Sequence, residues 1–176
     1  MFLQRERFHL ISYLESHASE IIEEMNAIPT ERYVPIEERV VERGVWRGFG
    51  LLDRIDLDRG EHFATNGRDC PRTRAVVERI PGILVVAFVR MGPHTQLHPH
   101  TDDQLPRFLR FHLALTPGED AWLQVGDERN AWQAGLCRGF DPQQLHSAAN
   151  DGAHPRVLLC VDVRYEDVDL PLLPTP

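Results

Sequence analysis

The sequence predicts a protein that begins with helices and continues as an antiparallel β domain. Apolar residues in the first 26 positions recur at three- and four-residue steps, which is typical of an amphipathic helix. From residue 83 onward, alternating and β-branched runs follow one another at spacings of roughly 8–12 residues, separated by turn signals. This spacing is typical of an all-β sandwich or barrel. We therefore expect a single domain over 1–176, with helical or irregular support over 1–80 and the β core over 83–165.

The N-terminal region is predicted to be mostly helical. Residues 2–26 carry an apolar stripe with glutamates on the opposite side, and Pro29 is a plausible stop beyond the end of this helix. A short strand is expected over 46–52. The polar stretch 53–70 is expected to be a loop, and 71–80 to be a short helix, because a proline suits its first turn.

The β core is predicted from runs of two kinds. Residues 83–89 form a continuous apolar run, as in a buried strand. Residues 108–115 alternate, so that Arg110, His112 and Ala114 share one face while apolar side chains occupy the other. Further strands are expected at 121–125, 131–135, 136–140 and 155–165, with a turn at 116–120 and a hairpin loop at 126–130.

Composition narrows the class of protein. The 176 residues are 42% hydrophobic and 26% charged, as in a soluble globular protein. The net charge of −8, without a long basic cluster, disfavours nucleic-acid binding. No window of about 18 apolar residues predicts a membrane span, and the start lacks a signal-peptide core, so we expect a cytoplasmic protein. The three cysteines show no disulfide or metal-binding spacing.

Arginine is the only permanent side-chain cation. All 19 Lys+Arg residues are arginines, which excludes Schiff-base chemistry through a lysine. Any anionic substrate must therefore be held by arginine. The sequence alone does not predict an oligomeric state.

The segment 92–103 has the highest density of metal-ligand side chains in the chain. It lies between two apolar runs, where a functional rim between strands is expected. Its candidate ligands are His94, His98, His100, Asp102 and Asp103.

Three residues could form a metal site of the facial-triad type. In an extended segment His100 and Asp102 point the same way, so both can reach one ion. His146, on a distant segment, is the best candidate for the third ligand. Two histidines and one carboxylate leave open positions on the metal, as in non-haem Fe(II) oxygenases. The open positions can take a bidentate co-substrate and dioxygen.

Two arginines are candidates for holding an anion inside the β domain. Arg156 begins the last apolar strand, and its planar fork suits a carboxylate such as the far carboxylate of 2-oxoglutarate. Arg110 lies on the same face of its strand as His112. The alternatives are structural ion pairs, Arg156 with Asp162 or Asp141 and Arg110 with Asp102 or Asp103.

These residues carry a family resemblance. The run Pro99–Asp102, Leu109–Leu113, Trp132–Gly135, Phe140–Asp141, His146, Asn150 and Arg156–Asp162 resembles the aspartyl/asparaginyl β-hydroxylase family of Fe(II)/2-oxoglutarate oxygenases, and Cys70–Thr73 with Ile80–Pro81 resembles its upstream segment. The resemblance covers about residues 66–165. It implies a double-stranded β-helix, or cupin-type jelly-roll barrel.

The resemblance also implies roles for named residues. His100 and His146 would bind iron, Arg156 and Arg110 would hold 2-oxoglutarate, and His112 would line the co-substrate pocket. The implied reaction hydroxylates an unactivated C–H bond of an amino acid that is free, peptidyl or carrier-bound. Dioxygen is consumed, and succinate and carbon dioxide are released.

The chain departs from part of that family. The vertebrate members have glycine where this chain has Asp102, so the complete triad looks more like the bacterial proline hydroxylases grouped with them. A serine that touches 2-oxoglutarate in the vertebrate enzymes falls at about Val89. The substrate therefore does not follow from the resemblance.

Two other interpretations remain open. In a generic metal cupin, His98, His100 and His146 would bind the metal, and Gln104 would stand where such proteins usually have glutamate. That protein could be an isomerase, a dioxygenase that does not use 2-oxoglutarate, or a small-molecule sensor. The second alternative is a β-sandwich interaction module whose histidines are incidental.

Overall fold

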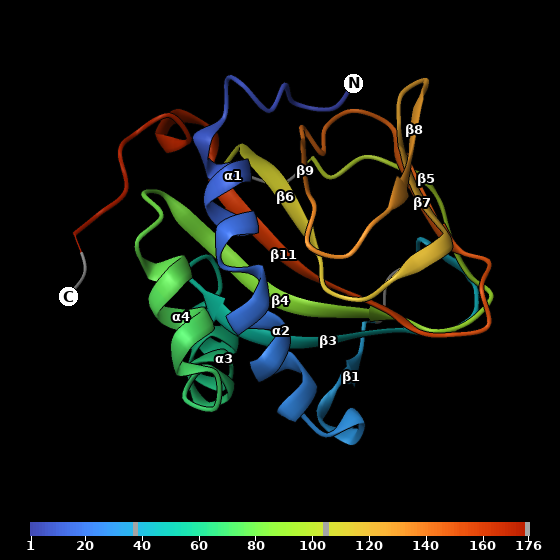
Figure 1. Ribbon diagram of the computed structural model, residues 1–176, viewed down its shortest axis with the longest axis horizontal. Helices are drawn as coiled ribbons and strands as arrows, with labels where there is room; N and C mark the ends of the chain where they lie inside the picture. The colour runs from blue at the N-terminus through green and yellow to red at the C-terminus, as the bar shows by residue number, and fades with distance from the viewer. Residues whose placement is uncertain (37–38, 104–105, 175–176) are drawn as a thin grey trace.

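Two antiparallel β-sheets face each other and enclose the inner core of the barrel (Figure 1). The computed structural model describes residues 1–36, 39–103 and 106–174. Sheet A has the strand order β1-β3-β4-β11-β6-β9, and sheet B has the order β2-β5-β10-β7-β8. This arrangement confirms the predicted double-stranded β-helix preceded by helices.

The elements divide into helices near the N-terminus and strands that dominate the rest. The helices are α1 His9–Ser16, α2 Ala18–Ala27, α3 Leu57–Gly67 and α4 Pro71–Glu78, with 3-10 turns at Thr30–Arg32 and Tyr165–Asp167. The strands are β1 Val34–Pro35, β2 Val41–Arg43, β3 Trp46–Asp53, β4 Ile83–Met91, β5 Thr95–His100, β6 Phe108–Ala114, β7 Gly118–Val125, β8 Glu128–Trp132, β9 Cys137–Phe140, β10 His146–Asn150 and β11 Arg156–Arg164.

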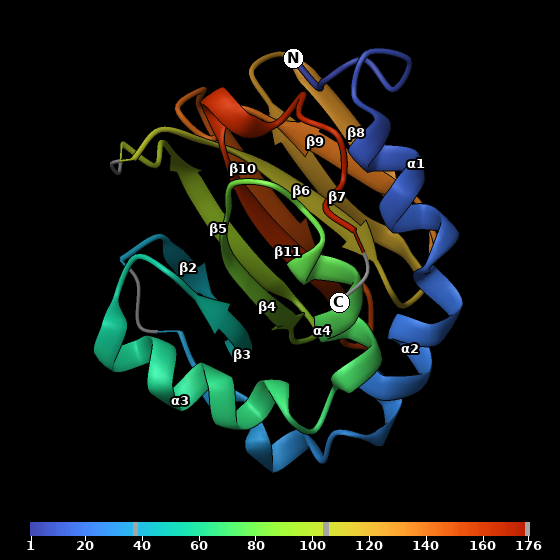
Figure 2. The ribbon, with the colours of Figure 1, turned by 90° about the vertical axis from the view of Figure 1, so that its left-hand side faces the viewer.

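Sheet A separates two hydrophobic cores. Helices α1 and α2 run along its outer face (Figure 2), and Leu109, Phe111 and Leu113 of β6 are buried in the core beneath the helices. The inner face of sheet A meets sheet B in a second, smaller core. Arg110 and His112 therefore point into the barrel, as the alternation of β6 predicts. Burial of each large apolar side chain contributes about 1.5–3 kcal/mol to this arrangement.

The prediction of one helix over 2–26 is wrong. The chain forms α1 and α2 with a break at His17, whose φ and ψ of −102° and 4° are not helical. Before α1 the chain forms a bridge at Phe2 and a turn over residues 5–7. Phe2 forms a bridge with Phe140, and Leu3 donates its backbone N–H to Gly139 at 2.8 Å. These first apolar residues extend sheet A at β9 instead of continuing the helical stripe.

The prediction of a loop over 53–70 is also wrong, because α3 occupies most of it. Asp56 caps this helix by accepting the backbone N–H of Arg59 at 3.0 Å. The helix packs on the inner side of β3 through Phe63, whose ring lies against Gly50 so closely that a side-chain Cβ there would overlap it. Because the partner of Phe63 in β3 is a glycine, no apolar side chain of β3 marks this contact in the sequence.

Three other differences concern strands. The strands β5 and β10 are absent from the sequence-based expectation, although both carry candidate ligands. The predicted turn 116–120 is partly strand, because β7 begins at Gly118. Before residue 80, β1 and β3 join sheet A and β2 joins sheet B, so the expected support region contributes strands to both sheets.

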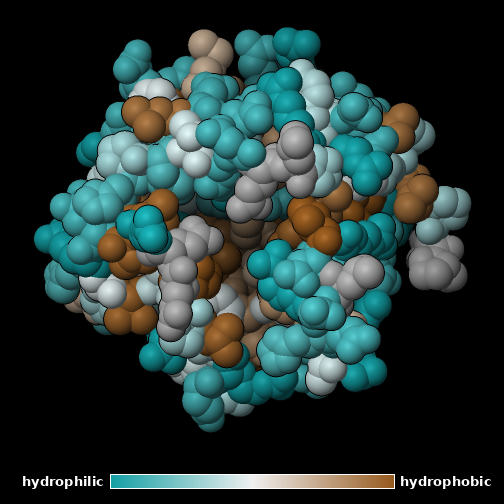
Figure 3. All heavy atoms as spheres, turned by 180° about the vertical axis from the view of Figure 1, so that it is seen from behind, coloured by the Kyte–Doolittle hydropathy of each residue, from teal (hydrophilic) through white to brown (hydrophobic). Residues whose placement is uncertain are grey.

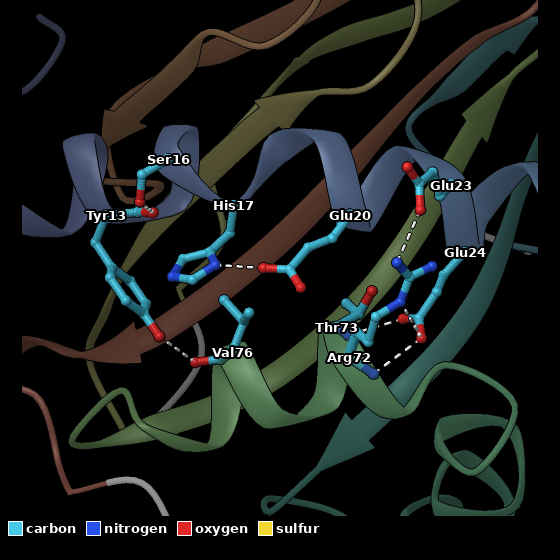
Figure 4. A network of polar contacts seen from close by, with 9 residues as sticks. All are labelled: Tyr13, Ser16, His17, Glu20, Glu23, Glu24, Arg72, Thr73 and Val76. Carbon is cyan, nitrogen blue, oxygen red and sulfur yellow. Dashed lines mark hydrogen bonds and ion pairs between the residues drawn. The ribbon is translucent and has the colours of Figure 1, made fainter.

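Helix α2 is tied to the start of α4 by a buried carboxylate (Figure 4). Glu24 accepts the backbone N–H groups of Arg72 at 2.9 Å and Thr73 at 2.7 Å. These N–H groups have no partner within the first turn of α4, so the carboxylate satisfies them and complements the helix dipole. The helical layer is thereby held in one position against sheet A.

Candidate metal centre

A β-bulge in β5 brings one histidine to the inside of the barrel. Leu97 pairs with Ala148 of β10, while His100 pairs with His146, so β5 has one residue more than β10 between the two pairs. Leu97 and Ala148 are both buried between the sheets. The extra residue turns His100 inward as well, since a bulge re-aims the side chains that follow it.

His100, Asp102 and His146 converge at this point. Their ligand atoms all lie within 4.8 Å of one another, and Nε2 of His100 is 3.9 Å from Oδ1 of Asp102. The two imidazole centroids are 4.2 Å apart. Asp102 follows the end of β5 and donates its backbone N–H to Pro142 at 2.9 Å. The donor set of two imidazoles and one carboxylate is the one that non-haem iron prefers.

Both histidines are oriented to present the same nitrogen. Nδ1 of His100 hydrogen-bonds to the carbonyl of His98 at 2.7 Å, and Nδ1 of His146 to that of Gln144 at 2.9 Å. A carbonyl only accepts, so each Nδ1 is the donor and each Nε2 is available to a metal. Burial lowers the pKa of His146 to about 4, which keeps it neutral at pH 7.

Asp102 is also held by an arginine. Nη1 of Arg110 donates to Oδ2 of Asp102 at 2.5 Å. The other edge of the guanidinium is bidentate on Asp162, with Nε to Oδ1 at 2.8 Å and Nη2 to Oδ2 at 2.9 Å. Burial works to lower the pKa of Arg110, but the nearby carboxylate of Asp162 raises it well above the usual value.

Arg156 has no acidic partner among the described residues. It is 3% exposed, and its Nε and Nη1 have no hydrogen-bond partner there. The guanidinium lies over the ring of Trp132, with its carbon 4.1 Å from the ring centroid. Burial lowers the pKa of Arg156 to about 9, so it remains a cation at pH 7. The alternative ion pairs with Asp162 or Asp141 do not form.

Two further buried donors or acceptors lie beside Arg156. Nε1 of Trp132 and Nδ1 of His112 are both buried without a partner in the described part of the chain. The ring centroids of these two residues are 5.8 Å apart. Burial lowers the pKa of His112 well below 6.5, and the cations of Arg110 and Arg156 lower it further. Neutral His112, Nε1 of Trp132 and the two unpartnered nitrogens of Arg156 form a buried polar cluster, whose N–H donors could accept an anion.

The inner face of sheet A also carries apolar side chains that are partly exposed. Ala87 pairs with Cys160 and Val89 with Leu158, so all four point between the sheets. Ala87, Val89 and Cys160 stay partly exposed although they lie on central strands. The face opposite helices α1 and α2 is hollowed near its centre, and hydrophobic side chains gather around the hollow (Figure 3).

The other candidate residues lie outside the cluster. His98 is on the outer side of β5, where its side chain is 51% exposed and lies 3.5 Å from Glu42. His94 and Asp103 are exposed. Asn150 is buried and donates to three backbone carbonyls, among them Gly92 at 2.9 Å. Gln104, which in the metal-cupin alternative would stand where such proteins usually have glutamate, lies outside the described residues.

Sequence reasoning missed the roles of two residues near the site. Asp162 was considered only as a partner for Arg156, and its alternation on β11 with Cys160 is the signal that could have placed it on the inner face. Trp132 entered only as part of the family resemblance, and nothing in the sequence predicted that its buried N–H would lie beside Arg156 without a partner in the described part of the chain.

Together these features define a class: a cupin-type barrel with a candidate mononuclear metal centre beside a buried arginine. The chain belongs to the aspartyl/asparaginyl beta-hydroxylase family, whose family model matches residues 15–165. It is 26% identical over 153 residues to an ornithine lipid ester-linked acyl 2-hydroxylase of Rhizobium tropici, a match that covers 85% of this chain. The chain spans about half the length of that relative, since the match covers 52% of it.

Solved structures with the same fold are distant in sequence. The non-heme alpha-ketoglutarate-dependent epimerase SnoN from nogalamycin biosynthesis is 16% identical, with a TM-score of 0.52 over 84% of this chain and 72% of that one. A cupin-like protein of Thermotoga maritima is 11% identical, with a TM-score of 0.50 over 79% and 84%. These likenesses support the fold. Within the described residues, no helix has the length and apolar character needed to cross a bilayer.

Proposed function

We propose that the chain is an Fe(II)/2-oxoglutarate-dependent hydroxylase. In this proposal His100, Asp102 and His146 hold the iron, and Arg156 binds the far carboxylate of 2-oxoglutarate. Family membership and the hydroxylase activity named for the relative support a hydroxylase. Dependence on iron and on 2-oxoglutarate is our inference from the site.

The buried guanidinium of Arg156, which has no acidic partner within the described residues, is the observation that carries the co-substrate proposal. A buried cation without a counter-ion costs free energy, so its presence is best explained by an anion that binds there. A carboxylate matches the planar fork in shape and charge. We do not assign Arg110 to the co-substrate, because its guanidinium already serves two carboxylates.

The residues of the chain supply orientation and exclusion of water. His100 and His146 present their Nε2 atoms, and Asp102 adds a carboxylate oxygen. Neutral His112 lies beside Arg156 without competing for its anion. Iron and 2-oxoglutarate, when bound, would supply the oxidising chemistry: one oxygen atom of dioxygen would enter the substrate as a hydroxyl group and the other would enter succinate, as 2-oxoglutarate loses carbon dioxide.

The partly exposed residues on the inner face of sheet A suggest the chemical character of the substrate. Ala87, Val89 and Cys160 offer no charge to a carboxylate or an amine at this point. An apolar reacting group fits best, and the acyl chain named for the relative is one such group. An amino-acid substrate, the expectation from the family resemblance, would place its apolar side chain here.

A succinate-release assay tests this proposal. Purified protein with Fe(II) and 2-oxoglutarate is screened against acyl-chain lipids, free amino acids and short peptides. We expect succinate formation that depends on iron, and loss of turnover in His146→Ala, which removes one of three ligands. Full turnover in His146→Ala would contradict the proposed metal site. The metal-cupin alternative predicts metal binding without any succinate.

A further inference from the structure

Asp162 is a buried carboxylate for which the proposed chemistry has no use. Its two oxygens accept Nε and Nη2 of Arg110, and the thiol of Cys160 lies 3.9 Å from one of them. It lies on the inner face of β11, directly across from Arg110 on β6. A buried carboxylate is costly unless it is paired, so its pairing with Arg110 is fixed by the fold.

The third donor of Arg110 points toward the metal site. Nη1 reaches Oδ2 of Asp102, while Oδ1 of Asp102 faces Nε2 of His100. The arginine therefore divides the two oxygens of Asp102 between two roles. One oxygen is held by the protein, and the other is directed toward the two imidazoles.

The charges of the three residues support the same division. Two carboxylates share one guanidinium, so a net negative charge remains next to the imidazoles. Asp162 neutralises Arg110, which would otherwise draw Asp102 away from a divalent cation. The bidentate contact also holds the planar guanidinium in one orientation, because a fork paired with a carboxylate cannot rotate freely.

We propose that Arg110 and Asp162 are positioning residues that hold Asp102 so that a single oxygen binds the metal. The proposal deepens the proposed function and rests on it. It replaces the expectation that Arg110 binds 2-oxoglutarate. Hydrogen-bonded partners of this kind commonly change metal affinity by about 10- to 100-fold.

The test measures Co(II) affinity of the metal-free protein, without 2-oxoglutarate. The double variant Arg110→Met/Asp162→Leu removes one charge of each sign, so the net charge of the site stays the same while Asp102 loses the donor that holds it. We expect its Kd for Co(II) to rise about 10- to 100-fold. Asp162→Asn, which keeps the shape of the side chain, should weaken binding in the same direction.

A matched control uses an ion pair remote from the site. Arg74→Met/Glu78→Leu makes the same kind of change to a surface pair on α4, and should leave the Co(II) affinity unchanged. Wild-type affinity in Arg110→Met/Asp162→Leu would overturn the positioning role while leaving the proposed function intact. Failure of the wild type to bind Co(II) would overturn both. Weaker 2-oxoglutarate binding with unchanged Co(II) affinity in Arg110→Met/Asp162→Leu would overturn the positioning role and indicate that Arg110 binds 2-oxoglutarate.

Discussion

At the scale of single residues, burial of Arg156 carries a cost in stability, and its role in the proposed function is to bind the co-substrate. Its guanidinium is buried under Trp132 and has unpartnered donors. Unsatisfied buried donors cost about 1–3 kcal/mol, more when charged. Such a cost is retained where function needs a pre-organised charge.

Arg156→Met should therefore stabilise the protein and abolish co-substrate binding. The variant keeps the packing but removes the buried charge, so we expect a gain of about 1–3 kcal/mol in the free energy of unfolding. Because burial leaves the pKa at about 9, Arg156 is charged in both the folded and unfolded states below pH 8, and the gain should not vary from pH 6 to 8. Thermal unfolding with and without 2-oxoglutarate measures both effects.

The control is an exposed arginine in the same geometry. The guanidinium carbon of Arg129 lies 3.8 Å from the ring centroid of Trp122 on the surface of sheet B. Arg129→Met should bring no gain in stability, and should leave stabilisation by 2-oxoglutarate unchanged. A destabilised Arg156→Met variant would show that the buried charge has a structural partner.

The lowered pKa of His112 predicts that the free energy of unfolding of the metal-free protein depends on pH. Burial holds the pKa of His112 well below 6.5. Near pH 6.5 this histidine therefore binds a proton in the unfolded chain but stays neutral in the folded protein. The contribution of neutral His112 to the free energy of unfolding is complete above pH 6.5. It decreases by about 1.4 kcal/mol per pH unit as the pH falls toward the pKa of the folded state. His112→Phe should reduce this slope by one proton. Urea unfolding at pH 7.5 and 5.5 measures it, and an unchanged slope would contradict the prediction.

The sequence was a better guide to the candidate metal ligands than to the hydrogen-bond partners of the residues around them. His100, Asp102 and His146 were recognisable because few residue types bind metals and their order suits a barrel. The choice between His98 and Asp102 was not predictable, because a bulge set by pairing with β10 decides which side chain turns inward. The partners of Arg110 were undecided because they are set by the register between β6 and β11.

At the scale of elements, one carboxylate fixes the helical layer (Figure 4). Glu24→Ala leaves two backbone N–H groups at the start of α4 without an acceptor, in a place where the carboxylate is only 7% exposed. We expect a loss of about 2 kcal/mol in the free energy of unfolding. Chemical denaturation measures it.

The neighbouring glutamate provides the control. Glu23 is 67% exposed, and its one ion pair among the described residues is with the guanidinium of Arg72, so Glu23→Ala should change stability by less than about 0.5 kcal/mol. Equal losses in Glu23→Ala and Glu24→Ala would show that general helix charge, and not the buried contact, stabilises the layer.

The packing of α3 on β3 gives a second prediction at this scale. Gly50→Ala forces a methyl group into the ring of Phe63, and we expect it to cost about 1–3 kcal/mol. Adding Phe63→Ala should relieve the overlap, so the double variant should lose less than the sum of the two single variants. Gly152→Ala, where the nearest atom to the added Cβ is 3.4 Å away, is the control. Additive losses would contradict the contact.

Elements were predictable where the pattern was local. The alternation of β6 and the apolar run of β11 led directly to strands whose faces are as expected. Helix α3 was missed because most of its residues are polar and Phe63 packs on a glycine, although Asp56 carries a capping signal. The strand β5 was missed because its polar and proline residues resemble a loop.

At the scale of the whole molecule, the candidate metal centre joins the two sheets. His100 and His146 belong to sheet B, while Asp102 is connected through Arg110 and Asp162 to sheet A. The order of strands in the sheets depends on pairings between distant segments, so the sequence predicted the class of fold and not this connection.

Metal binding should therefore raise the stability of both sheets together. At a free Co(II) concentration of 100 times Kd, linkage gives about 2.7 kcal/mol, which corresponds to roughly 5–11 °C in Tm for a chain of this size. Calorimetry should show one transition that shifts as a unit. Two transitions, of which only one responds to Co(II), would contradict the connection between the sheets.

The bulge in β5 has a consequence for comparing this chain with its relatives. One extra residue lets both Leu97 and His100 face inward, although they are three positions apart. A relative whose strand lacks the insertion would have to carry the equivalent histidine one position earlier to reach the same point. Ligand positions in an alignment should therefore be matched by strand pairing, and an apparent one-residue gap at this place marks conserved geometry and not a lost ligand.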